Sequence, residues 1–285
     1  MITLSRKYVK YCAIIFGAAL FFWQLAFAGN GSGFLEANFF DIGQGDAIFI
    51  EGPDGFQILV DGGPNSTILE KLGKEMGYFD RSIDIVVATH SDKDHAGGLM
   101  DVLKYYNVGE VWIGALENYY FSQSEFLRVL EEKKISLRYV KTGDDFNFNG
   151  LEVFVFNPPP NEKLKDNESS VVLKVLYGGV SFLLTADITV GVEKKLIESA
   201  RNALDSDILK AAHHGSKTST SEEFLEAVSP EIAVIQVGKD NLYGHPHQSV
   251  LERFERLGIP FFRTDKNGDI EIISDGKNYT VNSGN

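Results

Sequence analysis

Residues 89–98 place two histidines and two aspartates on one polar turn. The preceding residues 83–88 are mostly β-branched and apolar, and residues 99–106 form an amphipathic run. This pattern predicts a strand, a turn and a helix, and α/β proteins build their sites at such carboxyl-end turns. A solvated turn with Asp94 as helix N-cap is the simpler interpretation. We favour a metal site, because a divalent cation relieves the repulsion between crowded carboxylates and imidazoles.

The histidines of the whole chain are concentrated in such turns, and none lies inside a predicted strand or helix. They are His90, His95, His213, His214, His245 and His247. Histidines used as ordinary core or surface residues would be scattered, so this distribution favours a metal centre. Three aspartates, Asp46, Asp61 and Asp187, also lie at strand ends. They can serve as turn or cap residues, or they can support metal ligands.

Strands and helices alternate along the rest of the chain, which predicts helices packed on mixed sheets rather than a helical bundle. Strands are expected at 34–40, 47–50, 56–60, 83–88, 108–113, 137–140, 151–156, 171–176, 180–184, 206–212, 232–237 and 261–263, with a final hairpin around 275–276. Helices are expected at 65–78, after the turn to about 106, after a capping box at 122–125, and at 190–203, 221–228 and 250–257.

The first 28 residues are typical of a targeting segment, in which three basic residues precede an apolar run that ends in Ala26-Phe27-Ala28. We expect a signal peptide or an N-terminal membrane anchor at 1–28, a Gly-rich linker at 29–33 and one domain at 34–285. Either form of the leader predicts an exported protein that is secreted or anchored outside the cytoplasmic membrane. The lone cysteine, Cys12, lies in the leader, so disulfides do not stabilise the domain.

The chain is acidic, with a net charge of −13, and the leader contributes three positive charges and no negative ones, which leaves −16 for the remainder. Such a surface disfavours non-specific, salt-driven binding of nucleic acid. It does not exclude a nuclease, because metals and a local basic patch can provide the field that phosphate needs.

Six stretches together resemble the metallo-β-lactamase family and, more narrowly, its ComEC-like branch of exported metallo-hydrolases linked to bacterial DNA uptake. They are Phe40–Asp46, Val60–Gly63, Thr89–Gly98, Leu184–Asp187, Ala212–Lys217 and Asn241–Pro246. The resemblance implies an α/β fold, a four-layer αββα sandwich with mixed sheets. Asp92 replaces the histidine of the general family motif, as is usual for this branch. No histidine lies between His95 and His213, so the pair at 213–214 is expected to replace a missing ligand.

The resemblance also implies two divalent metal ions, Zn²⁺ or Mn²⁺, held by His90, Asp92, Asp94, His95, Asp187, His213 and His245. Asp187 would bridge the ions, and Asp94 would be catalytic as well as a ligand. Sequence leaves open which of the paired histidines ligates; we favour His213, with His214 as the acid facing the leaving group. Asp61 would orient the His90 turn. Supporting or substrate-contacting roles fall to Asp46, Asn167, Ser216, Lys217 and His247, of which His247 fits a surface position equally well.

The expected function is therefore that of an exported hydrolase, a ComEC-like nuclease that cleaves DNA or RNA through a hydroxide bridging two metals. A phosphodiesterase acting on a small or cell-wall phosphodiester is the alternative, and a non-catalytic surface binding module is a third. A phosphodiester is the expected partner, the membrane is contacted only through the N-terminal segment, and no protein partner is evident. A role in DNA import does not transfer, because a single leader segment stands where ComEC has its membrane channel.

Overall fold

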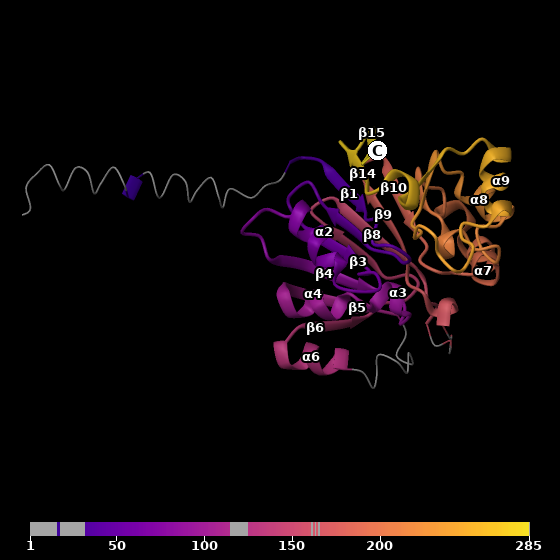
Figure 1. Cartoon of the computed structure of the whole chain (residues 1–285). Helices are drawn as coiled ribbons and strands as arrows, with labels where there is room; N and C mark the ends of the chain where they lie inside the picture. The colour runs from indigo at the N-terminus through magenta and orange to yellow at the C-terminus, as the bar shows by residue number, and fades with distance from the viewer. Residues whose placement is uncertain are drawn as a thin grey trace, which may run out of the picture.

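Two β-sheets lie face to face between two layers of helices in the computed structural model of the chain (Figure 1). The structure describes residues 16–17, 32–114, 125–160, 162, 164 and 166–284. Almost all of the predicted leader, and residues 122–124 of the capping box expected at 122–125, lie outside the described residues. No helix within the described part combines the length and the apolar character needed to cross a membrane.

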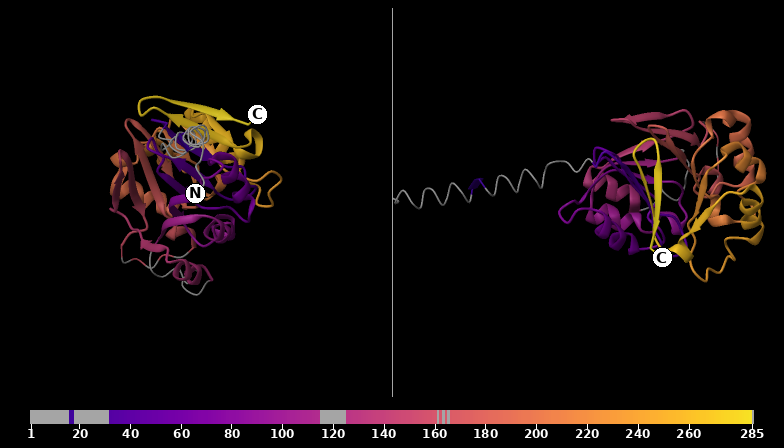
Figure 2. Two further views of the ribbon diagram at one scale, coloured as in Figure 1. Left: turned by 90° about the vertical axis from the view of Figure 1, so that its left-hand side faces the viewer. Right: turned by 90° about the horizontal axis from the view of Figure 1, so that it is seen from above.

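The first sheet has the strand order β15-β14-β1-β2-β3-β4-β5-β6, with parallel pairing from β3 to β6 and antiparallel pairing elsewhere. Its strands are β1 (Leu35–Phe39), β2 (Ile48–Glu51), β3 (Gln57–Val60), β4 (Ser82–Ala88), β5 (Asn107–Ile113), β6 (Ser136–Tyr139), β14 (Ile270–Ser274) and β15 (Tyr279–Ser283). Figure 2 shows the C-terminal hairpin β14–β15, in yellow, along one edge of this sheet.

The second sheet has the order β13-β12-β11-β10-β9-β8-β7, parallel from β10 to β13 and antiparallel from β7 to β10. Its strands are β7 (Asp145–Phe148), β8 (Leu151–Asn157), β9 (Val172–Tyr177), β10 (Val180–Leu184), β11 (Ile208–Lys210), β12 (Ile232–Ile235) and β13 (Phe261–Arg263). Strand β7 was not predicted, and β11 is shorter than the strand expected at 206–212.

The helices fall into two groups, one on the outer face of each sheet. Helices α2 (Thr67–Glu75), α3 (Lys93–Ala96), α4 (Leu99–Tyr105) and α6 (Glu125–Lys133) accompany the first sheet; α7 (Val190–Ala200), α8 (Glu222–Val228), α9 (Gln248–Leu257) and α10 (Thr264–Asn267) accompany the second. Short 3₁₀ turns lie at η1 (Asp166–Ser169), η2 (Arg201–Ala203) and η3 (Ala212–Gly215). The order of layers confirms the expected αββα sandwich.

The direction of side chains along the strands explains this layering, because successive residues of a strand point to opposite faces of the sheet. Phe39 and Trp112 of the first sheet pack with Phe182 and Val234 of the second in the layer between the sheets. The opposite faces of the strands bury separate apolar clusters against α2, α4 and α6 and against α7, α8 and α9. The central layer therefore fixes the two sheets against each other, and with them the strand ends that carry polar residues.

The helix expected after the 89–98 turn is observed as α4, and the turn itself contains the additional short helix α3, which Gly97 and Gly98 separate from α4. A Cβ on Gly98 would lie 2.1 Å from the Gly62 carbonyl oxygen, a contact that no other residue can accept. The turn after β3 therefore packs against the turn after β4, and this contact holds the two side by side.

Candidate metal centre

The polar turns predicted from sequence meet at one end of the two sheets. Asp61 follows β3 and the His90 turn follows β4, while Asp187 follows β10 and His214 follows β11. Strands that run parallel end at the same edge, so their carboxyl-end turns converge there. The centre consequently receives side chains from both sheets.

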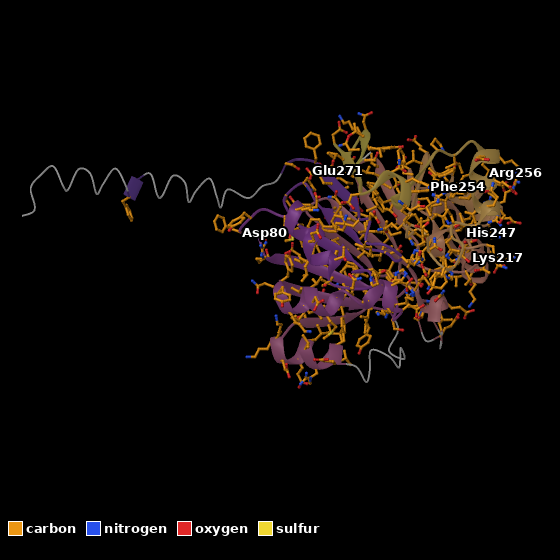
Figure 3. The ribbon with its side chains drawn as sticks, viewed as in Figure 1. Asp80, Lys217, His247, Phe254, Arg256 and Glu271 are labelled. Carbon is orange, nitrogen blue, oxygen red and sulfur yellow. The ribbon has the colours of Figure 1, made fainter. Side chains whose placement is uncertain are left out.

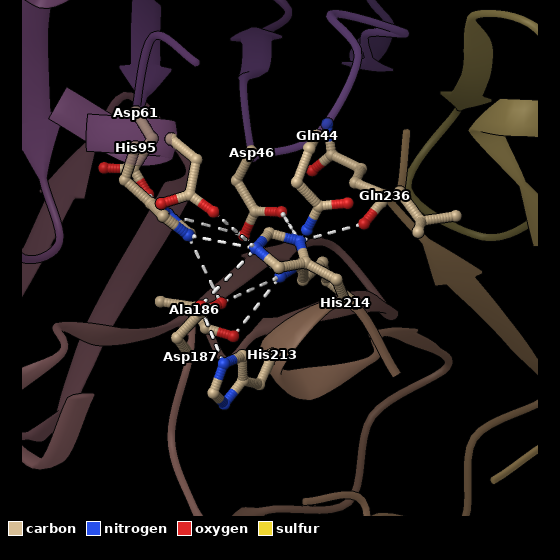
Figure 4. Close-up of polar contacts among 12 residues, drawn as sticks. Gln44, Asp46, Asp61, His95, Ala186, Asp187, His213, His214 and Gln236 are labelled. Atoms are coloured by element: carbon tan, nitrogen blue, oxygen red, sulfur yellow. Dashed lines mark hydrogen bonds and ion pairs between the residues drawn. The ribbon is translucent and has the colours of Figure 1, made fainter. Parts of the chain in front are cut away.

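Four buried side chains form the inner part of this centre: Asp46, His95, Asp187 and His214, each offering one ligand atom within 4.8 Å of the others (Figure 4). His95 Nε2 lies 3.3 Å from Asp187 Oδ1 and 3.3 Å from His214 Nε2. His214 Nε2 lies 3.4 Å from Asp187 Oδ2. Two imidazoles and two carboxylates at this spacing suit a divalent cation with nitrogen and oxygen ligands.

Unpaired polar atoms provide a test of whether these residues fit a metal. Asp46 Oδ1, Asp187 Oδ1, His90 Nε2 and His245 Nδ1 are buried without a hydrogen bond, although both carboxylates lie near imidazoles. A buried polar atom without a partner is costly. Four such atoms around one centre are explained by cations, and the donors present therefore fit divalent metal.

A rim of further polar residues surrounds the inner four, and all of them except the buried His90 are more exposed than the inner group. Asp94 Oδ2 lies 3.4 Å from His214 Nε2, and His213 Nε2 lies 3.7 Å from Asp187 Oδ2. His90 Nε2 lies 3.7 Å from Asp92 Oδ2, and the His245 ring lies 5.7 Å from that of His213. Because the His90 and His95 rings are also in contact at 4.1 Å, all seven predicted metal ligands belong to one connected group.

Neither aspartate of the turn is used as a helix cap. Asp92 occupies the N-cap position of α3, yet its side chain makes no capping hydrogen bond. Asp94 lies in the first turn of that helix and reaches His214 instead. The alternative of a plain capped turn therefore does not describe these carboxylates.

The charges of the inner group stabilise one another strongly in the absence of metal. Burial alone would lower the pKa of His95, but the carboxylates of Asp187, Asp61 and Asp46 outweigh it and raise the pKa to about 10. Asp187 and Asp46 likewise outweigh burial and raise the pKa of His214. Burial would raise the pKa of Asp187, but His214 and His95 hold it well below its usual range. Without metal, protons thus provide the positive charge that the carboxylates require.

The pKa values of two rim histidines, His213 and His245, are lowered instead. Burial, with His214 and Lys210 adding positive charge, lowers the pKa of His213 in spite of Asp187. Burial and the neighbouring histidines lower the pKa of His245 to about 4. Both rings are therefore neutral near pH 7, the state in which imidazole binds metal or donates one hydrogen bond.

Hydrogen bonds to protein groups hold the inner ligands in place. Asp61 Oδ2 lies 2.7 Å from His95 Nδ1 and accepts a bond from the Thr89 hydroxyl, which in turn contacts His90 Nδ1 at 3.0 Å. His214 Nδ1 lies 2.9 Å from the Gln236 carbonyl oxygen. Such carboxylate and carbonyl partners fix the tautomer and orientation of metal-binding histidines. Asp61 thus contacts His95 directly and reaches the His90 turn through Thr89.

The backbone is strained where it delivers these groups. Asp61, Ala186, His213 and His214 have φ angles of 60°, 46°, 50° and 54°, in the left-handed region that non-glycine residues rarely occupy. Strain of this kind persists where the surroundings enforce it, and it clusters at functional sites. His213 and His214 point in different directions because both have left-handed backbone conformations. The alternation of side chains along a regular strand does not apply to them.

The structure places the two rings of that pair differently from the expectation. His214 is fully buried in the inner group, whereas the His213 side chain is 25% exposed and faces the rim. This buried position of His214 does not fit the expected acid that faces a leaving group. The left-handed turn of η3 sends the second histidine, not the first, into the interior.

The supporting residues also differ from expectation in part. Asp46 belongs to the inner group itself, and Asn167 Nδ2 lies 3.4 Å from His213 Nδ1. The buried Ser216 hydroxyl contacts Thr218 Oγ1 at 3.0 Å. His247 caps α9, where its Nδ1 accepts from the Ser249 amide at 3.3 Å, so it acts as a surface cap. Figure 3 shows His247 and the exposed Lys217 at the margin of the α7–α9 half.

Sequence reasoning missed Lys210, whose buried ammonium forms an ion pair with Asp46, lies 3.9 Å from Asp187 Oδ1 and donates to the Ala186 carbonyl oxygen at 3.2 Å. A lysine inside a predicted buried strand was the available signal, because lysine is rarely buried without a charge partner. With neutral imidazoles, one lysine and five carboxylates leave four negative charges, a surplus that favours bound cations. The carboxylates are Asp46, Asp61, Asp92, Asp94 and Asp187.

Known proteins are similar to this chain in sequence. ComE operon protein 3 of Bacillus subtilis (strain 168) is 33% identical over 256 residues, which make up 83% of this chain and 32% of that protein. Competence protein ComA of Neisseria gonorrhoeae is 37% identical over 192 residues, 67% of this chain and 25% of that protein. The chain therefore spans about a third or less of the length of these relatives.

A solved structure and a family model agree on the fold. The metallo-beta-lactamase fold protein YhfI from Bacillus subtilis has a TM-score of 0.57 at 9% identity, over 83% of this chain and 99% of that one. The model of the metallo-beta-lactamase superfamily matches residues 40–239. That match contains the inner four residues and the turns that carry them. The chain belongs to the metallo-beta-lactamase superfamily, within its ComEC-like branch.

Proposed function

We propose that this protein is an exported, metal-dependent phosphodiesterase that cleaves DNA or RNA with two divalent ions, Zn²⁺ or Mn²⁺. The observation that carries the proposal is the inner group of Asp46, His95, Asp187 and His214 together with the carboxylate-rich rim around it. Similarity to a protein named a competence protein supports nucleic acid as substrate.

The donor set suits phosphoryl chemistry. Imidazole nitrogens and carboxylate oxygens without thiolate bind divalent ions of intermediate to hard character, such as Zn²⁺ and Mn²⁺. When bound, such ions neutralise charge on phosphoryl oxygens and lower the pKa of water. The five carboxylates would hold the positive charge of the ions, and Lys210 offsets part of their negative charge through its ion pair with Asp46. The Asp61 and Gln236 contacts keep the two inner imidazoles oriented.

His213 replaces His214 as the residue that meets the substrate. Its side chain is partly exposed and its Nδ1 lies 3.4 Å from the Asn167 amide nitrogen, so the ring has a fixed orientation at the rim. A neutral imidazole carries one N–H, which can donate to a phosphate oxygen or to the departing oxygen. Asn167 would then be a positioning residue for His213.

Export is part of the proposal and rests on the leader sequence. Three basic residues followed by an apolar run and Ala26-Phe27-Ala28 are typical of export signals. Fractionation of cells that produce the full chain should place it in the medium or on the membrane. Recovery of the full chain from the cytosol alone would contradict export without touching the hydrolase assignment.

Nuclease assays on purified protein test the activity. With Mn²⁺ or Zn²⁺, the protein should degrade labelled single- or double-stranded DNA or RNA, and Asp187→Asn should abolish cleavage. Asp101→Asn, a partly exposed carboxylate on α4, is a matched control that should keep full activity. Intact substrates under all conditions would refute the nuclease.

A second candidate, a phosphodiesterase acting on a small or cell-wall phosphodiester, is favoured by the net charge of −13, which repels polyanions. Hydrolysis of bis-p-nitrophenyl phosphate that depends on Asp187, without any cleavage of nucleic acid, would select this candidate over the nuclease.

A further inference from the structure

A rigid loop between β12 and α9 presents two large apolar side chains to solvent beside the metal centre. Leu242 is 99% exposed and Tyr243 is 71% exposed, and the same loop carries His245. Large apolar groups held in ordered, exposed positions are typical of binding surfaces.

The aromatic rings of this loop connect the surface with the centre. The Tyr243 ring stacks on His245 with centroids 5.8 Å apart and planes 22° apart. The His245 ring lies 5.7 Å from His213, which contacts Asp187. A flat group placed against Tyr243 would thus lie one ring away from the rim of the centre.

One side chain, Asn241, makes this loop rigid. Its Nδ2 donates to the carbonyl oxygens of Gly238 and His245, at 3.0 and 2.6 Å. Its Oδ1 accepts from the amides of Tyr243 and His245, at 3.2 and 3.0 Å. Four hydrogen bonds from one amide fix the position of Tyr243 before any ligand arrives, which lowers the entropic cost of binding.

Neighbouring turns also hold the base of the loop. Gly238 donates to Gln44 Oε1 at 3.2 Å, and a Cβ on Gly238 would lie 2.5 Å from the Gln44 amide nitrogen. At the other end, a Cβ on Gly215 would lie 2.6 Å from Pro246 Cβ. The loop is therefore packed on both the Gln44 turn and the paired-histidine turn.

We propose that Tyr243 and Leu242, backed by His245, form a stacking subsite for an unpaired nucleobase next to the phosphodiester in the metal centre. This inference rests on the proposed nuclease function and narrows its substrate to single-stranded nucleic acid. Every base has a π-face, so stacking on an aromatic side chain binds single strands with little sequence preference. Paired bases in a duplex are already stacked and cannot reach the Tyr243 ring.

The acidity of the chain supports stacking as the source of affinity. A protein with a net charge of −13 gains little from counterion release, which otherwise dominates binding of nucleic acid. Stacking contacts with bases do not depend on attraction between positive side chains and the phosphates. Binding should therefore depend less on salt than binding by a basic groove does.

The test compares two substrates that differ only in their bases. One is a short labelled oligothymidylate, and the other is an oligomer of equal length in which every nucleotide is abasic, so that the phosphates are kept. With Mn²⁺, Tyr243→Ala should raise KM for the oligothymidylate about tenfold. The same variant should leave cleavage of the abasic oligomer unchanged, and Tyr243→Phe should behave as wild type.

Matched controls separate stacking from a general surface effect. Phe79 is 87% exposed on the loop between α2 and β4, and Phe79→Ala should leave KM for both oligomers unchanged. Leu242→Ser should raise KM for the oligothymidylate by a smaller factor than Tyr243→Ala. Thermal unfolding of Tyr243→Ala should match that of wild type, because an exposed ring contributes little to stability.

The outcomes distinguish this inference from the function on which it rests. If wild type cleaves neither oligomer and no other nucleic acid, the nuclease proposal fails and the subsite fails with it. If wild type cleaves the oligothymidylate and Tyr243→Ala does so with the same KM, only the subsite is refuted. Loss of sedimentation with phosphatidylglycerol vesicles in Tyr243→Ala, with unaltered oligonucleotide cleavage, would assign the loop to a membrane surface and also refute it.

Discussion

The Lys210 ammonium lies against the Asp46 carboxylate in an ion pair from which solvent is almost fully excluded. Removal of Lys210 leaves the buried Asp46 carboxylate without its nearest counter-charge. Lys210→Met should therefore lower the free energy of unfolding of the metal-free protein by about 3–5 kcal/mol, measured by urea denaturation with a chelator present.

The control is Lys195→Met. The exposed Lys195 ammonium lies 3.1 Å from Glu162 Oε2, and its loss should change the free energy of unfolding by no more than about 0.5 kcal/mol. The combined variant Asp46→Asn with Lys210→Met should be less destabilised than the sum of the single changes. Equal effects of Lys210→Met and Lys195→Met would show that the buried pair is not important for stability.

The pH dependence of stability should reverse when metal is added. The pKa of His95 is raised from 6.5 to about 10 in the folded, metal-free protein. A raised folded-state pKa stabilises the fold while the ring is protonated, so this contribution is complete below about pH 6.5 and is lost as the pH approaches about 10. Urea unfolding with a chelator should show stability falling across this range.

Saturating Mn²⁺ should abolish or invert that fall, because metal binding requires deprotonated imidazoles and strengthens as the pH rises. At the acidic end, the lowered pKa values of Asp46 and Asp187 mean that their contributions disappear as the pH falls below the usual aspartate range. If the free energy of unfolding depended on pH in the same way with and without metal, this would contradict the idea that metal replaces the protons on the inner histidines.

Asp61→Asn should weaken metal binding by about 10–100-fold without removing a ligand, because Asp61 orients His95 through a 2.7 Å contact. Competition with a chromogenic chelator gives the affinity directly. Asp101→Asn is again the matched control, since its carboxylate lies on α4 near Lys104. An unchanged metal affinity in Asp61→Asn would indicate that His95 is held by packing alone.

Gly45→Ala should disrupt the centre while the same change at Gly73 should not. A Cβ on Gly45 would lie 2.0 Å from the Asp94 carbonyl oxygen, and its φ of +133° disfavours other residues. Displacement of Asp94 and the adjoining Asp46 should lower both metal content and the melting temperature. Gly73 lies in α2 with open space around it, so Gly73→Ala should stabilise the fold by about 0.5–1 kcal/mol.

The sequence indicated which polar turns the structure brings together, but not how the individual side chains are placed within that group. The strand–turn–helix pattern at 83–106 and the turn positions of the histidines depend on local periodicity, which a sequence displays directly. The sandwich and the family followed from several short motifs together. All seven predicted ligands lie in one connected group because they follow strands whose ends converge.

The errors have physical causes that local patterns do not display. Two consecutive left-handed residues at His213 and His214 are set by the packing around η3, so sequence could not tell which ring is buried. The lysine in the predicted strand at 206–212 indicated a buried charge, but its partner Asp46 could not be identified because it lies 164 positions away along the chain. Strand β7 alternates charged or amide residues with aromatic ones, and the prediction included only its neighbour β8.

Ligands from both sheets converge on the same four-residue group, and this has a consequence for how the protein tolerates change. Asp46 and His95 are positioned by the first sheet, whereas Asp187 and His214 are positioned by the second. Any slip of one sheet over the other alters all the distances between these pairs at once. The metal affinity would therefore report how the two sheets are positioned relative to each other. Loss of a methyl group from the core near Phe182 or Trp112 should change the metal affinity before it changes other properties of the protein.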